Sequence, residues 1–182
     1  MIILMGVAGA GKSMQSRTLA DDYGYAWIST GEILRVLITG KRRQEMLAGK
    51  LLSDDEMIQV MDKVLDLIDP TQEFVLDGFP RTVKQADWLL RQVKKGRFKL
   101  TAIFHLAASE EVVRSRLKGR GRLDDSDEAI SRRFEEYRSV TLPIIDHFKK
   151  EGIDLYDIDA SQELRSVHQA IIKAIHNTPL DK

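Results

Sequence analysis

The sequence predicts an α/β fold in which helices cover both faces of a five-stranded parallel sheet. Short apolar runs alternate along the chain with longer segments of helical periodicity, and strands that take turns with helices form parallel sheets. The length of 182 residues suits one packed domain. The hydrophobic content of 43% and the charged content of 31% are those of a globular protein.

Five apolar runs predict the strands. They lie at residues 2–5, 74–76, 100–106 and 155–158, with a weaker candidate at 26–28. Most of them are apolar without alternation, which is typical of strands that are buried on both faces. Six periodic segments predict helices at residues 12–23, 54–68, 83–94, 110–117, 127–150 and 162–177.

Local start signals support several of these helices. A Ser or Thr that is followed three residues later by Glu or Gln predicts a capping box. The pattern occurs at Ser29 with Glu32, at Ser53 with Glu56, and at Thr82 with Gln85. Ser109 and Ser161 are expected to cap the helices that follow them. At residues 127–150 an apolar face that runs from Ile130 to Phe148 predicts one continuous helix.

Two regions interrupt the alternation of strands and helices. Residues 30–68 lack a strong strand signal, so we expect a helical insertion there. Residues 119–125 read GRGRLDD and form a charged loop with two glycines. We therefore expect a single domain over 1–182, with these two segments set into a core of residues 1–29, 69–118 and 126–182.

Composition excludes several classes of function. The formal net charge is zero, and the basic run at 94–99 has no interleaved aromatic residues, so we expect no binding to nucleic acid. The absence of cysteine excludes disulfides and a thiolate zinc site. Neither a leader peptide nor an apolar run of bilayer length is evident. We expect a cytoplasmic protein, a monomer, that has no membrane partner.

A phosphate-binding motif directly follows the first predicted strand. Residues 6–13 read GVAGAGKS, which matches the pattern G-x-x-x-x-G-K-[ST] of the P-loop. Its glycines let consecutive backbone N–H groups face a phosphate, and the N-terminus of the next helix adds partial positive charge. In such a loop Lys12 reaches the β- and γ-phosphates and Ser13 holds Mg²⁺.

Four motifs in order resemble the adenylate kinase family in its short-lid form. They are the P-loop, ISTGEILR at 28–35, LDGFPRTVKQ at 76–85, and GRLDD at 121–125 followed by RRFEEYRSVTLP at 132–143. The resemblance covers nearly the whole chain. It implies a P-loop NTPase-like three-layer sandwich in which 30–68 binds the monophosphate and 119–125 is a short lid. The implied activity is reversible transfer of the γ-phosphoryl group of Mg-ATP to a nucleoside monophosphate.

The resemblance also implies roles for individual residues. On the ATP side it points to Gly9, Ala10, Gly11, Lys12, Ser13, Met14, Arg116 and Arg120, with the Arg116 side chain packed on the adenine. On the monophosphate side it points to Thr30, Arg35, Leu51, Leu52, Gly78, Arg81, Gln85, Arg122 and Arg133. The catalytic cations would be Lys12, Arg81, Arg120, Arg122 and Arg133. Mg²⁺ would lie near Ser13 and, through water, near Asp77; zinc is not expected.

This chemistry needs no general base, because the attacking group is a phosphate oxygen that is already anionic. The difficulty lies in bringing together about four negative charges on ATP and two on the monophosphate. Seven cationic side chains and Mg²⁺ would supply roughly +9 against this charge of about −6. Catalysis then consists of positioning and charge neutralisation.

The identity of the acceptor depends on two residues. Thr30 and Gln85 are similar to those of AMP-specific members, because an amide can both donate to and accept from the adenine edge. AMP as acceptor gives two ADP, and a pyrimidine or broad-specificity monophosphate kinase is the alternative. Ala8 stands where the family usually has proline, and Ser13 and Met14 stand where it has Gly and Thr. This departure leaves open a catalytically weak nucleotide-binding sensor.

Some of these residues have a second interpretation. Gln85 also completes the capping box with Thr82, and both roles can coexist. Arginines on charged helices, such as Arg116 and Arg133, are by themselves typical of solvated faces. Asp124 and Asp125 fit either helix capping or hydrogen bonding within the lid. His105, near the end of a strand, is expected to be a packed histidine rather than a catalytic one.

Overall fold

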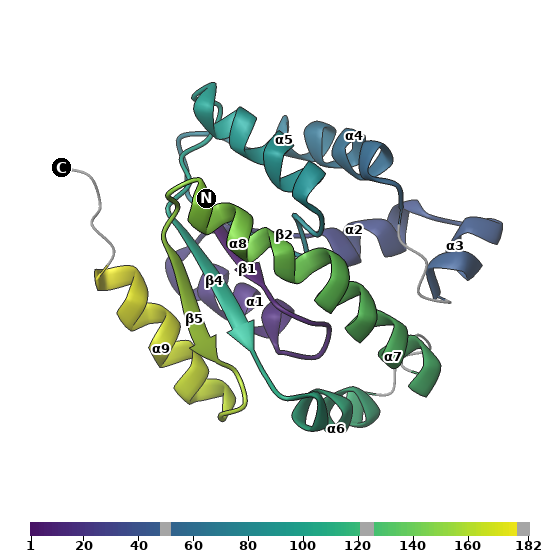
Figure 1. Cartoon of the computed structure of the whole chain (residues 1–182). Helices are drawn as coiled ribbons and strands as arrows, with labels where there is room; N and C mark the ends of the chain where they lie inside the picture. Colours follow the sequence, from purple (N-terminus) through teal and green to yellow (C-terminus); the bar gives the residue numbers. More distant parts are fainter. Residues whose placement is uncertain (48–51, 121–125, 178–182) are drawn as a thin grey trace.

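Five parallel strands form one central sheet in the computed structural model, which describes residues 1–47, 52–120 and 126–177 (Figure 1). Their order across the sheet is β2-β3-β1-β4-β5. The bounds are β1 Ile2–Met5, β2 Ala26–Ser29, β3 Phe74–Asp77, β4 Ala102–Ala107 and β5 Leu155–Asp159. The predicted sheet is thus confirmed, with strand ends shifted by at most two residues.

The register of the strands aligns their carboxyl ends. Leu4 of β1 pairs with Asp77 of β3, and Met5 pairs with His105 of β4. His105 in turn pairs with Asp157 of β5. Because all strands run the same way, the loops that follow β1, β2 and β3 meet at one edge of the sheet, which is where α/β folds bind ligands.

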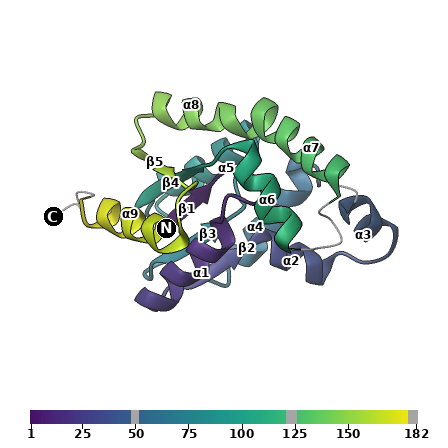
Figure 2. The ribbon, with the colours of Figure 1, turned by 90° about the horizontal axis from the view of Figure 1, so that it is seen from below.

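Helices cover both faces of the sheet, and Figure 2 shows α1 and α8 on opposite sides of it. The helices are α1 Lys12–Tyr23, α2 Thr30–Leu37, α3 Gly40–Leu47, α4 Asp54–Leu65, α5 Val83–Lys94, α6 Glu110–Arg120, α7 Asp127–Glu136, α8 Leu142–Lys150 and α9 Leu164–Asn177. In the described part of residues 30–68, α2, α3 and α4 separate β2 from β3. Among the residues that the structure describes, no helix combines the length and the apolar character that a membrane crossing requires.

The core consists of two hydrophobic clusters, one on each face of the sheet. Ile3, Leu76 and Ile103 belong to the first cluster, together with buried residues of α4, α5 and α8. Ile2 and Phe104 belong to the second cluster, together with residues of α1, α6, α7 and α9. Alternate residues of one strand therefore serve different layers, as expected for a sheet that is covered on both faces.

The predicted helix at 127–150 is interrupted, which corrects the expectation of one continuous helix. α7 ends at Glu136, five residues at Tyr137–Thr141 form a π-helix called η1, and α8 follows at once. A π-helical turn moves the following residues around the helix axis. Phe134 therefore packs in the second cluster, whereas Ile144 and Phe148 pack in the first. An unbroken helix with one apolar stripe could not serve both clusters.

Two predicted helix caps are confirmed, and in both the hydroxyl accepts from a backbone amide three residues later. Ser53 and Glu56 form the capping box of α4, and the Ser109 hydroxyl accepts a hydrogen bond from the amide of Val112. The expected cap at Ser161 is wrong, because α9 begins only at Leu164 and the amide of Ser161 donates to the Asp159 carboxylate instead. Ser126 caps α7, while Asp124 and Asp125 lie outside the described residues.

Candidate active site

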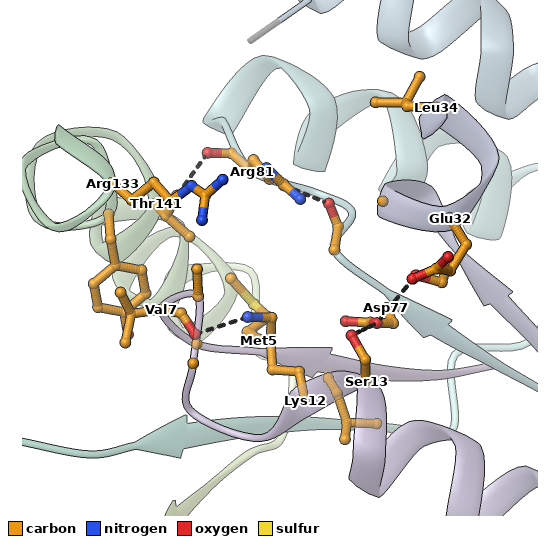
Figure 3. A pocket seen from close by; sticks show the side chains of 18 of the residues that line it. Met5, Val7, Lys12, Ser13, Glu32, Leu34, Asp77, Arg81, Arg133 and Thr141 are labelled. Carbon is orange, nitrogen blue, oxygen red and sulfur yellow. Dashed lines mark hydrogen bonds between the residues drawn. The ribbon is translucent and has the colours of Figure 1, made fainter. Parts of the chain in front are cut away.

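A cavity of about 1200 Å³ lies at the carboxyl edge of the sheet (Figure 3). Its lining comes from the loop after β1, the start of α2, the segment after β3, and the helices α6 and α7. This volume slightly exceeds the range of about 300–1,000 Å³ that is usual for one small ligand. The cavity therefore has space for two ligands that meet inside it.

The P-loop forms one wall of this cavity. Gly6 has φ +141°, and a Cβ atom on it would lie 2.5 Å from the backbone oxygen of Leu106, so a side chain at this position would push the loop away from β4. Lys12 Nζ donates to the carbonyl of Val7 at 2.9 Å, which holds the charged group over its own loop (Figure 3). Of the predicted ATP-side residues, Gly9, Gly11, Lys12, Ser13 and Met14 line the cavity, whereas Ala10 is buried.

Two serines converge on the carboxylate of Asp77 at the end of β3. Ser13 Oγ donates to Asp77 Oδ2 at 2.5 Å, and Ser29 Oγ donates to the same oxygen at 3.3 Å. Hydroxyl and carboxylate oxygens are ligands that Mg²⁺ accepts, and a Mg²⁺ ion shared with nucleotide phosphates needs only one or two protein oxygens. The donor set at Ser13 and Asp77 therefore fits the predicted ion.

The segment after β3 carries Arg81 into the cavity. Arg81 Nε donates to the Gly78 carbonyl at 2.8 Å, which fixes the direction of the guanidinium (Figure 3). Gly78 has φ +83°, and a Cβ atom on it would lie 2.5 Å from Thr30 Oγ1. Buried Thr30 itself donates to the Asp77 carbonyl and does not line the cavity. Its role is therefore to hold the backbone of this segment.

Positive charge is concentrated around Arg81. Loss of hydration lowers the pKa of Arg81, Arg133 and Arg35 lower it further, and Asp77 and Glu136 oppose them. Arginine nevertheless stays charged in proteins. Arg133 reaches the cavity from α7 and Arg35 from α2. The guanidinium groups of Arg35 and Arg133 thus act on that of Arg81, and this concentration of positive charge favours an anionic ligand beside Arg81.

The start of α2 differs from its predicted form. The Ser29 side chain makes no capping hydrogen bond, because its hydroxyl donates to Asp77, and Glu32 accepts from Arg35 at 2.7 Å. The predicted capping box is therefore wrong. A long-range hydrogen bond to Asp77 replaces a local one.

Gln85 lies at the first turn of α5 and is 4% exposed. Its Oε1 accepts from the Arg81 amide at 2.8 Å, and its Nε2 donates to Asp54 Oδ1 at 2.8 Å. Thr82 Oγ1 caps the amide of Gln85, so one half of the predicted capping box is present. Gln85 does not line the cavity, whereas the predicted residues Leu52 and Gly78 do.

Arg116 lines the cavity from α6. Its guanidinium donates to the carbonyl of Ala160 at 2.7 Å and to that of Gln162 at 3.0 Å. Guanidinium hydrogen bonds lie in the plane of the group, so they are compatible with a ligand ring stacked on its flat face. Met14 and Leu164, which are 55% and 48% exposed, line the cavity near it and offer apolar surface.

Three predicted residues are not placed by the structure. Leu51 and Arg122 lie outside the described residues, and the side chain of Arg120 is not described either. The described residues bring Lys12, Ser13, Arg35, Asp77, Arg81, Arg116 and Arg133 to one cavity.

Several cavity residues were given no role at the site in the sequence analysis. Arg42 of α3 and Glu56 of α4 form an ion pair on the lining, and Tyr137 and Thr141 of η1 line it as well. The Thr141 hydroxyl donates to the Arg81 carbonyl at 3.1 Å. Spacing could have indicated Tyr137 and Thr141, since each follows at intervals of four residues after Arg133.

Comparison with known proteins agrees with this geometry. A family model described as adenylate kinase matches residues 4–153, more than half of the chain. The chain belongs to the adenylate kinase family. Curated adenylate kinases extend the match: that of Mycolicibacterium vanbaalenii is 37% identical over 180 residues, covering 96% of this chain and 98% of the relative. Those of Corynebacterium urealyticum and Oenococcus oeni are 36% and 33% identical, covering 96% and 97% of this chain and 98% and 97% of the relatives.

Family membership confirms the resemblance that the four sequence motifs carry. The adenylate kinase family match includes the P-loop lysine, the segment after β3 and Arg133, all of which line the cavity. The matches to the first two of these relatives cover 98% of each relative's length.

Proposed function

We propose that the chain catalyses reversible transfer of the γ-phosphoryl group from Mg-ATP to AMP, which gives two ADP. Adenylate kinase activity follows from the family and from relatives that match nearly the full length. The observation that supports the reaction most directly is the shared cavity. It is lined by the P-loop with Lys12 at one wall and by Arg35, Arg81 and Arg133 at the other.

The reaction needs a bond between a phosphate oxygen of AMP and the γ-phosphorus. The bond from that phosphorus to the bridging oxygen breaks, and its electron pair leaves with ADP. Arg35 and Arg81 hold the AMP phosphate, and the P-loop amides hold the phosphates of ATP. Lys12 and Arg133 stabilise charge on the transferred group. For this, Lys12 Nζ has to leave the carbonyl of Val7 and turn towards the phosphates.

Magnesium enters this proposal at Ser13 and Asp77. Bound Mg²⁺ supplies charge neutralisation at the nucleotide phosphates. Ser13 contributes its hydroxyl oxygen, and Asp77 orients ligands through its carboxylate, which Ser29 also contacts. Because Ser13 and Asp77 are hydrogen-bonded to each other, the ion would replace a bond that already aligns both groups.

Exclusion of water completes the proposed mechanism. An open cavity would let water attack ATP, so the core, the insertion 30–68 and the lid 119–125 are proposed to close over both nucleotides. The Arg116 face, Met14 and Leu164 are proposed to contact the adenine of ATP. Leu52 and Gly78 are proposed to border AMP. Thr30 and Gln85, which do not line the cavity, are proposed to support this side of the site by holding the backbone of Asp77 and Arg81.

An acceptor panel tests the choice of AMP. ADP or the corresponding diphosphate is measured with Mg-ATP and AMP, GMP, CMP, UMP or dTMP. AMP is expected to give the highest kcat/KM. The amide of Gln85 is already bonded to Asp54 and to the Arg81 backbone. This observation favours the broad-specificity alternative as a second candidate, and a higher kcat/KM with UMP or CMP would establish it.

An arginine substitution tests the shared cavity. Arg81→Ala should lower kcat at least about a hundredfold, because it removes a cation that faces the transferred charge. Arg91→Ala is the matched control, since Arg91 is an exposed arginine on the nearby helix α5. Undiminished turnover in Arg81→Ala would refute the proposed roles. Nucleotide binding without turnover in the unsubstituted chain would instead identify a sensor.

A further inference from the structure

His105 is a buried polar residue that the proposed reaction does not use. It lies on β4, directly beside Met5 of β1 and Asp157 of β5, and only 8% of its surface is exposed. Met5 is the last residue before the P-loop. His105 therefore lies beside Met5, the strand residue from which the phosphate-binding loop starts.

Both ring nitrogens of His105 have partners from other elements. Nδ1 lies 2.7 Å from Asp157 Oδ1, and Nε2 contacts the Tyr137 hydroxyl at hydrogen-bond distance. An ionised carboxylate only accepts hydrogen bonds, so Nδ1 donates to Asp157. In that tautomer Nε2 carries no proton and accepts from the Tyr137 hydroxyl. Burial and Asp157 raise the pKa of Tyr137 to about 12, so its hydroxyl keeps the proton that this bond needs.

Tyr137 connects His105 on β4 to α7, the helix that carries Arg133. It is the first residue of η1, and its amide donates to the carbonyls of Arg133 and Phe134 at the end of α7. Tyr137 and Arg133 both line the cavity. At the other end of η1, Thr141 bonds to the backbone of Arg81. The π-helix is thus held at both ends, beside two of the proposed catalytic arginines.

We propose that His105 is a positioning residue for phosphoryl transfer: through its hydrogen bond to Tyr137 it holds the last turn of α7, and hence Arg133, in register with the P-loop. The inference rests on the proposed function, since it gives Arg133 a role in the transfer. Arg133 acts on charge that develops during transfer, so its misplacement lowers kcat more than it raises KM.

Two substitutions of His105 separate positioning from packing. The amide of glutamine lies near the place of Nε2, so His105→Gln can still bond to Tyr137. The amide of asparagine lies near the place of Nδ1, so His105→Asn can still bond to Asp157 but does not reach Tyr137. His105→Asn is expected to lower kcat about tenfold or more, with KM values for ATP and AMP changed less than about threefold. His105→Gln should retain kcat within about threefold.

Tyr137→Phe provides the same test from the other side, because it keeps the ring and removes only the hydroxyl. It should lower kcat as His105→Asn does. His147→Gln is the matched control. His147 lies on α8 with Nε2 2.7 Å from Asp87 of α5, outside the lining of the cavity. This change is expected to lower the melting temperature and to leave kcat unchanged.

All variants are assayed well below their melting temperatures with the acceptor that the unsubstituted chain uses best. Equal kcat values in His105→Gln and His105→Asn would overturn the inference, as would a Tyr137→Phe variant with full kcat or a change confined to KM. These outcomes leave turnover of the unsubstituted chain intact. Failure of the proposed function is a different result, because turnover is then absent in that chain and in His147→Gln as well.

Discussion

Gly6→Ala should disrupt the packing of the P-loop against β4. A Cβ atom at this position would lie 2.5 Å from the backbone oxygen of Leu106, and neither backbone can move without disturbing the pairing of β1 and β4. The positive φ of +141° adds conformational strain of about 1–3 kcal/mol. Overpacking adds about 1–3 kcal/mol, so the total loss of stability is about 2–6 kcal/mol.

Gly24→Ala is the control for conformational strain alone. Gly24 has φ +69°, and a Cβ atom there would meet nothing within 4 Å. Its cost should stay at about 1–2 kcal/mol. For a chain of this length each kcal/mol corresponds to about 2–4 °C of melting temperature. Scanning calorimetry and turnover are measured for both variants. Equal melting temperatures and equal kcat values would refute the argument that the close approach at Gly6 builds the loop.

Three further predictions concern stability, pH and metal. Phe148→Ala should cost about 3–5 kcal/mol in urea unfolding, because this ring is fully buried in the first cluster; a loss below about 1 kcal/mol would contradict that packing. Hydrogen bonds from Ser53 and Arg42 lower the pKa of Glu56 to about 2, below its ordinary value of 4.5. The stabilisation by Glu56 is therefore complete above about pH 4.5 and is lost as the pH falls towards 2, so Glu56→Gln should abolish this part of the acid dependence of unfolding. Asp77→Asn should raise the Mg²⁺ concentration for half-maximal activity at least about tenfold, whereas an unchanged Mg²⁺ titration would remove Asp77 from the metal site.

Much of the fold could be predicted because its signals are local. α1 and α5 begin and end at the predicted residues. α1 begins directly after Gly11, the last glycine of the P-loop. α5 begins directly after Thr82, whose hydroxyl caps the helix. Most of the strands were found because burial on both faces favours an unbroken apolar run. Lys12, Arg35, Arg81 and Arg133 were predicted as site residues because they lie inside motifs whose spacing is specific, and all four line the cavity.

The remaining features depend on contacts between residues far apart in the sequence. Ser29 reads as a helix cap, but its hydroxyl bonds to Asp77, 48 residues away. The π-helix at Tyr137–Thr141 has no local signal either, since it results from the change of packing partner between Phe134 and Ile144. His105 was rightly expected to be packed and buried. Its contact with Tyr137, 32 residues away, could not be read from the strand in which it lies.

The segment that runs from α7 through η1 to α8 packs in both hydrophobic clusters, one on each side of the sheet. Because one helical segment packs in both clusters, local unfolding of one cluster is expected to disrupt the other as well. Amide protons on the two sides of the sheet should therefore exchange with solvent in one cooperative event rather than layer by layer.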